Sequence, residues 1–72
     1  MTHTTPDTSN GSPYDRGAAD SYYRRSYAPH YWPEGTYKGQ QVTQESMTPQ
    51  QVREYEMGWD NNEMEGDFKD YG

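Results

Sequence analysis

The chain has 72 residues and can form one domain at most, and because it contains no Cys it can form no disulfide, thiolate metal site or cysteine nucleophile. It contains eight Tyr, two Trp and one Phe but no Leu or Ile, so a core must be built from aromatic rings around small residues. The net charge is −6, no apolar run approaches the roughly 18 residues of a membrane span, and no signal segment opens the chain, so we expect a soluble, cytoplasmic protein.

Residues 1–11 are rich in Thr, Ser, Asn and Pro and show no apolar period, which predicts a disordered leader. Because nothing in this leader suits burial, we expect it to be dispensable for folding. The folded domain is expected to span residues 12–66, and an acidic, aromatic tail follows at residues 67–72.

A first helix is predicted over residues 13–27. Ser12 suits the N-cap, Pro13 suits the first helical position, and Asp15 complements the helix dipole in the first turn. Gly17 and Ala18 leave the middle of this helix nearly bare. Glycine destabilises a helix interior by about 1 kcal/mol relative to alanine, and one reason to tolerate it is close approach by another backbone or a large ring.

Residues 28–48 form the predicted connection, in which two prolines end the first helix and forbid another soon after. Two glycine-containing turn signals allow a short hairpin spanning Tyr37 to Val42. We expect Tyr31 and Trp32 to anchor this ordered, aromatic-rich loop on the helices.

The second helix, over residues 49–65, is the most strongly predicted element. Thr48 suits the N-cap, Gln51 completes a capping box, and Gly66 offers a left-handed C-cap. An apolar stripe follows helical spacing and consists of Val52, Tyr55 and Trp59.

The core is predicted where the two helices cross at small residues, with rings filling the flanks. Its expected members are Gly17, Ala18, Tyr22, Tyr55, Gly58 and Trp59. The predicted fold is therefore all-α, with two antiparallel helices joined by the aromatic-rich loop. In the tail, Phe68 and Tyr71 are expected to fold back on the helices or to serve as a short partner-binding peptide.

Catalytic and metal signatures are missing from the sequence. It has no nucleophile elbow and no glycine-rich phosphate loop, and a chain this short lacks the volume to enclose a substrate. The segment from Asp60 to Gly66 resembles a calcium loop, but Glu65 stands where the loop needs glycine. His30 has no second His or Cys at ligand spacing. We expect no enzyme, no cofactor, no metal and no small-molecule substrate.

One candidate surface mixes rings and cations, which suits base stacking and phosphate contact. Its RNA-binding candidates are Arg16, Tyr23, Arg24, Arg25, His30 and Lys38. In the competing interpretation most rings of this region belong to the core, and the arginines at the end of the first helix only complement its dipole.

The second candidate surface is acidic. Residues 1–40 carry four acids and four bases (4 − 4 = 0), whereas residues 41–72 carry two bases and eight acids (2 − 8 = −6). The predicted acidic interaction face consists of Glu54, Glu56, Asp60, Glu63 and Glu65. It suits a basic partner, or it is simply a solvated helix face. We expect these acids to lie on the far side of the molecule from the candidate surface of rings and cations described above.

Four short segments resemble ribosome modulation factor, a family of small paired helices: residues 15–19, 24–25, 29–32 and 55–59. The resemblance implies binding to the small ribosomal subunit and silencing of translation. That family is strongly basic, as phosphate neutralisation requires, whereas this chain carries −6. The chain also resembles small uncharacterised proteins of tailed phages, which share R-G-x-A-D-x-Y-Y, P-H-x-x and G-D-F-K-D segments.

Three functions remain open from the sequence. The first is a ribosome- or RNA-associated regulator of translation. The second is an acidic, phage-type interaction protein that binds and inhibits a basic surface of a host protein. The third is a structural or assembly component.

Overall fold

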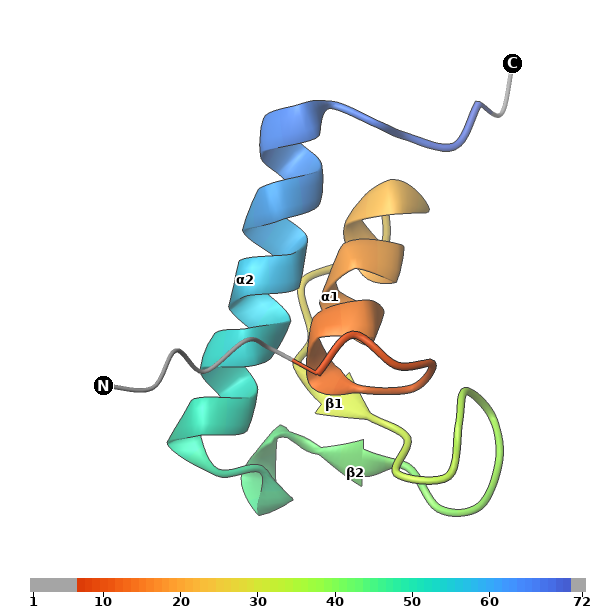
Figure 1. Ribbon diagram of the computed structural model, residues 1–72, viewed down its shortest axis with the longest axis vertical. Helices are drawn as coiled ribbons and strands as arrows, with labels where there is room; N and C mark the ends of the chain where they lie inside the picture. The colour runs from red at the N-terminus through yellow and green to blue at the C-terminus, as the bar shows by residue number, and fades with distance from the viewer. Residues whose placement is uncertain (1–6, 71–72) are drawn as a thin grey trace.

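A computed structural model describes residues 7–70 of the chain. It contains two helices and a small two-stranded sheet (Figure 1). The elements in chain order are α1 (Pro13–Tyr22), β1 (His30–Tyr31), β2 (Val42–Thr43), a 3-10 turn η1 (Gln44–Ser46) and α2 (Pro49–Glu65). The protein is therefore mainly helical, but the strictly all-α prediction is wrong because the connection carries the sheet.

Both ends of α2 are confirmed as predicted. The Thr48 hydroxyl accepts a hydrogen bond from the Gln51 amide (3.1 Å), and the Gln51 side chain accepts one from the Thr48 amide (2.9 Å). Gly66 ends the helix in the left-handed conformation at φ +67°. A side-chain N-cap such as Thr48 stabilises a helix by about 1 kcal/mol.

Helix α1 ends at Tyr22, so the predicted extension to residue 27 is wrong. The amide of Arg24 donates to the Ser21 carbonyl (3.0 Å), and the amide of Arg25 donates to the Asp20 carbonyl (2.8 Å). This pair of bonds is a Schellman ending, which requires a left-handed residue, and Arg24 takes that place at φ +59°. Glycine usually fills this position, so the sequence carried no visible stop signal here.

The two helices run in the same direction, and the predicted antiparallel arrangement is wrong (Figure 1). Gly17 lies against Tyr55, whereas Ser21, one turn further along α1, bonds to Asn62 and Glu63 further along α2. Contacts that advance together along both helices define a parallel pair. The long connection makes this possible because it returns the chain to the starting end of α1.

The helices cross at their glycines, as predicted. A Cβ atom at Gly17 would lie under 3.0 Å from the Tyr55 carbonyl, and one at Gly58 would lie under 3.0 Å from the Tyr14 carbonyl. Real Cβ atoms essentially never come so close, so each glycine permits direct contact between the two backbones.

Tyr55 is the centre of the small core and is completely buried. The other predicted core residues surround it to different depths. Gly17 and Gly58 are buried, whereas Ala18, Tyr22 and Trp59 are half-buried. The Trp59 ring stacks on Tyr55 with 6.5 Å between ring centroids, so aromatic contact does replace the missing aliphatic side chains.

The connection pairs different residues from those of the predicted hairpin. The strands are antiparallel, with His30 opposite Thr43 and Tyr31 opposite Val42. Tyr37, where the hairpin was expected to start, lies in a turn at φ +64°. Tyr31 does anchor the connection, because its hydroxyl accepts a hydrogen bond from the Gln51 side chain at 3.1 Å.

The segment before α1 belongs in part to the fold. Gly11 is buried, its carbonyl accepts a hydrogen bond from the Trp32 amide (2.7 Å), and its amide donates to the Asp15 carboxylate (2.9 Å). The Asn10 side chain accepts from the Thr36 amide (2.8 Å). The expectation that nothing in residues 1–11 is buried is therefore wrong, while residues 1–6 of the predicted leader lie outside the described residues.

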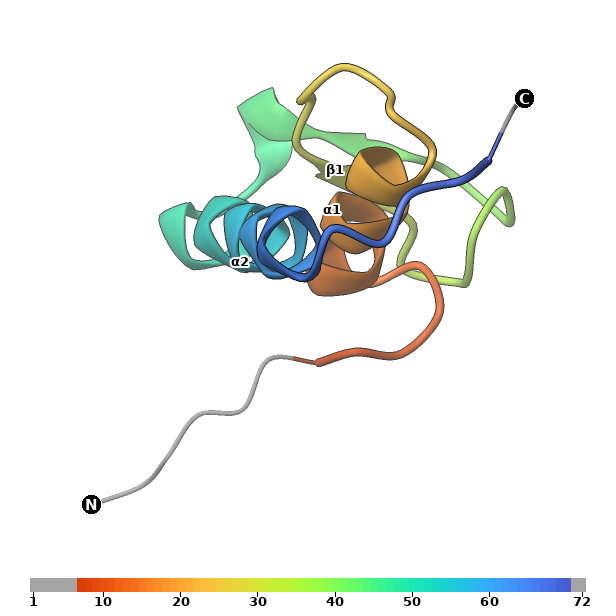
Figure 2. The ribbon, with the colours of Figure 1, turned by 90° about the horizontal axis from the view of Figure 1, so that it is seen from above.

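The tail folds back on the end of α1, where it can be followed in Figure 2. The Lys69 amide donates to the Tyr22 carbonyl at 2.7 Å. The Arg24 guanidinium lies over the Phe68 ring, 4.9 Å from its centroid. Tyr71, the other aromatic residue of the tail prediction, lies outside the described residues.

Candidate functional site

A buried carboxylate organises the region between α1 and the connection. Asp20 accepts one hydrogen bond from the Tyr55 hydroxyl and another from the Arg25 guanidinium (3.3 Å). The Tyr55 hydroxyl in turn accepts from the Ala28 amide (3.2 Å). His30 donates from Nδ1 to the Ala28 carbonyl (2.8 Å) and lies 3.7 Å from Asp20. Asp20 is not among the residues predicted from the sequence. Its position among the small residues 17–21 of α1 could have indicated a buried carboxylate.

This network holds Tyr55 in its neutral form. Burial raises the pKa of the Tyr55 hydroxyl, and its hydrogen bond to Asp20 raises the pKa further. A buried polar network in which each member has a partner is stabilising, whereas loss of one member leaves a desolvated group behind. The network is therefore part of the core.

The structure turns two of the six RNA-binding candidates inward. Arg16 is buried, donates to the Thr36 hydroxyl (3.2 Å) and lies 3.8 Å from the Asp15 carboxylate. His30 belongs to the Asp20 network, with only 12% of its side chain exposed.

The remaining RNA-binding candidates do lie at the surface. Arg25 is paired with Asp20, and its guanidinium lies 4.7 Å from the centroid of the Tyr23 ring. Tyr23 is 38% exposed, and Arg24 and Lys38 are exposed. The six predicted residues thus do not form one open basic surface.

The predicted acidic face divides into two parts on α2. Successive residues turn by about 100° around a helix, which places Glu56, Asp60 and Glu63 within about 60° of one another. Glu54 and Glu65 fall on the opposite flank of the helix. We call the first group, Glu56, Asp60 and Glu63, the acidic flank; all three of its residues are exposed.

Within residues 7–70, the acidic flank takes part in none of the ion pairs of Arg16, Arg25 and His30. Glu63 does accept a hydrogen bond from the Ser21 hydroxyl (2.6 Å). Two free carboxylates four residues apart, Glu56 and Asp60, therefore face solvent.

Two aromatic rings border this flank. Tyr27 follows α1, is 47% exposed, and packs edge-on against Trp59 with 5.3 Å between ring centroids. Burial raises the pKa of the Tyr27 hydroxyl, and the charges of Glu56 and Asp60 raise it further. Glu56 and Trp59 are three residues apart on α2, a spacing at which helical side chains are neighbours. Tyr27 is not among the predicted site residues, although it belongs to the same stretch of rings and cations as Tyr23 and Arg25.

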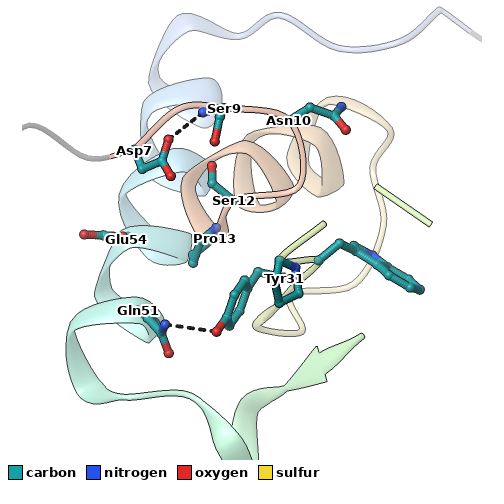
Figure 3. Close-up of a pocket in the computed structure, with 10 residues that line it drawn as sticks. Asp7, Ser9, Asn10, Ser12, Pro13, Tyr31, Gln51 and Glu54 are labelled. Atoms are coloured by element: carbon teal, nitrogen blue, oxygen red, sulfur yellow. Dashed lines mark hydrogen bonds between the residues drawn. The ribbon is translucent and has the colours of Figure 1, made fainter. Parts of the chain in front are cut away.

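A cavity of about 300 Å³ lies on another side of the molecule (Figure 3). Three segments line it: the chain from Asp7 to Pro13, the region from Tyr31 to Pro33, and α2 at Gln51 and Glu54. The Tyr31–Gln51 hydrogen bond crosses one wall. Its charged lining groups are two acids, Asp7 and Glu54, and hydrogen bonds from Ser9 lower the pKa of Asp7. This charge disfavours an anionic ligand.

Within residues 7–70 no group of three or more His, Cys, Asp or Glu side chains is placed to hold a metal ion. In the same residues no helix is long and apolar enough to cross a membrane. Comparisons with protein-family models, with curated proteins and with solved structures find no match to this chain.

Proposed function

We propose that this protein is a non-enzymatic binding protein whose acidic flank attaches to a basic surface of another protein. The observation that carries the proposal is that exposed acids of α2 lack ion pairs within residues 7–70, whereas two arginines have them. Glu56 and Asp60 are exposed and outside the ion pairs of the described residues, whereas Arg16 and Arg25 are paired with acids of the same chain. Together with the net charge of −6, this arrangement attracts basic surfaces and repels phosphate.

The acids of α2 stand where they weaken the helix, which supports a role in binding. Glu56 and Asp60 are four residues apart, a spacing at which like charges destabilise a helix by about 0.2–0.5 kcal/mol. The last turn holds no base, and Glu63 and Glu65 lie at this end, where the helix dipole disfavours negative charge. A basic partner would relieve both effects.

An RNA target has less support. Arg16 and His30 are inside the fold, and Arg25 is paired with Asp20. The tail also brings Phe68 against Arg24, so the acidic tail lies beside this arginine. The resemblance to ribosome modulation factor still favours RNA, and an experiment separates the two targets.

The test compares three variants with matched changes of charge. Glu56→Gln/Asp60→Asn removes two charges from the acidic flank, and Glu34→Gln/Glu45→Gln removes two from the connection. Arg24→Gln/Lys38→Gln removes two exposed cations that belong to the RNA-binding candidates. Each variant is used to capture proteins from a lysate of the source cells, and ribosome co-sedimentation is measured in parallel.

We expect the flank variant to lose a captured protein that carries a basic surface, while the other two variants retain it. The opposite pattern, in which Arg24→Gln/Lys38→Gln abolishes ribosome co-sedimentation and the flank variant does not weaken it, would establish the RNA target instead. Equal capture by all variants would refute an electrostatic binding surface.

A further inference from the structure

Beside the acidic flank, the rings of Tyr27 and Trp59 form a surface whose chemistry specifies the group that it can hold. Tyr27 is 47% exposed and Trp59 is half-buried, and their centroids lie 5.3 Å apart at an interplanar angle of 79°. A third ring, the fully buried Tyr55, supports Tyr27 from below with 5.2 Å between centroids. The aromatic pair is therefore fixed in place by the core.

Carboxylates border these rings on the side of α2. Glu56 precedes Trp59 by three residues and Asp60 by four, spacings at which side chains are neighbours on a helix surface, and both acids are exposed. Burial raises the pKa of the Tyr27 hydroxyl, and the charges of the two acids raise it further. An aromatic face attracts a cation through its quadrupole, and an adjacent carboxylate adds charge-assisted hydrogen bonds. The combination of a ring face and two acids complements a cation that has a flat, apolar surface.

We propose that Tyr27, Trp59, Glu56 and Asp60 form a seat for an arginine side chain of the partner. Arginine fits better than lysine because its planar guanidinium stacks on a ring while its N–H groups bond to carboxylates at the edge. The seat rests on the proposed function, since it identifies the group by which a basic protein would be held.

The experiment uses the full chain with Trp32 replaced by Phe, which leaves Trp59 as the fluorescent reporter. A short acetylated and amidated peptide of alternating arginine and glycine is titrated against it at low salt, and the lysine counterpart is titrated in parallel. The variants are Glu56→Gln/Asp60→Asn, the matched pair Glu34→Gln/Glu45→Gln, and Tyr27→Leu beside Tyr27→Phe.

We expect the arginine peptide to bind more tightly than the lysine peptide. Tyr27→Leu should weaken binding of the arginine peptide by about fivefold, the size of a cation–π contact, whereas Tyr27→Phe keeps the ring and the affinity. Glu56→Gln/Asp60→Asn should weaken binding by about tenfold or more, and Glu34→Gln/Glu45→Gln by much less.

Two results would overturn the seat and leave the proposed function standing: equal affinity for both peptides, or unchanged affinity in Tyr27→Leu when the flank variant has lost binding. If neither charge variant alters binding, the proposed function fails as well. Thermal melts check that Tyr27→Leu is folded. If this variant does not fold, the chemical shift of the Trp59 indole N–H is followed in the Trp32→Phe chain during both peptide titrations. A shift with the lysine peptide as large as the shift with the arginine peptide would then overturn the seat.

Discussion

Replacing Gly58 by alanine tests the contact on which the helix pair depends. The new Cβ would lie under 3.0 Å from the Tyr14 carbonyl and 3.0 Å from the Ala18 amide nitrogen, whereas ordinary contact begins at 3.4 Å. Both neighbours are backbone atoms, so no side chain can rotate away. The helices must therefore move apart at the crossing by at least 3.4 − 3.0 = 0.4 Å.

Two opposing effects set the magnitude for Gly58→Ala. Overpacking typically destabilises by about 1–3 kcal/mol, and we expect the upper end because the backbone neighbours of Gly58 cannot rotate away. The better helix propensity of alanine stabilises the folded state by about 1 kcal/mol. The expected net loss is about 2 kcal/mol, which lowers the melting temperature by roughly 8–16 °C in a domain of this size.

Thermal unfolding followed by circular dichroism measures this loss. Asn61→Ala is the matched control, since it improves helix propensity at an exposed position of α2 without meeting α1. The control should melt at or slightly above the parent temperature. A Gly58→Ala variant that melts as high as the control would refute the close crossing.

Three further predictions concern other parts of the fold. Tyr55→Phe removes the hydroxyl that donates to Asp20, and should lower the free energy of unfolding by about 1–3 kcal/mol in urea titrations at neutral pH. Because the pKa of Tyr55 is raised in the folded state, its contribution is fully present below the ordinary value of 10.0 and is lost as the pH rises above it, so the parent should lose more stability there than Tyr55→Phe does. Gly11→Ala, at φ +90° against the Trp32 carbonyl, should destabilise by about 1–3 kcal/mol; an unchanged melt would show that the segment before α1 is dispensable after all. Glu65→Gln should stabilise α2 by about 0.3–1 kcal/mol, and a gain that persists in high salt would rule out the dipole as its cause.

Local signals in the sequence were sufficient for α2 and for the helix crossing. The Thr48 capping box and the C-cap at Gly66 act within one turn, so neighbouring residues determine them. Gly17 and Gly58 interrupt helices at a cost that only a close contact explains, and the structure supplies that contact.

The direction of the helices could not be predicted in the same way. Periodicity identifies the buried face of a helix but not the direction in which its partner runs, and a connection as long as residues 23–48 can reach either end. The early stop of α1 was hidden because Arg24 adopts the conformation that glycine usually takes.

The candidate sites were predictable only in part. Charge counting identified the acids of α2, and helical spacing alone separates the acidic flank from Glu54 and Glu65. The inward placement of Arg16 and His30 depends on Asp20 and on the course of the connection, which no local pattern encodes.

Because α1 and α2 are parallel, no tight turn joins them. In an antiparallel pair, such a turn lets the helices begin to pack between residues that are close in the sequence. Gly17 and Gly58 are 58 − 17 = 41 residues apart, and helix α1, with ten residues, is too short to persist alone. The two helices can therefore first contact each other only by closing a long loop, which costs chain entropy before any stabilising contact has formed. Because non-local contacts form only after this loop has closed, folding of this domain should be slower than that of a helical hairpin of equal length.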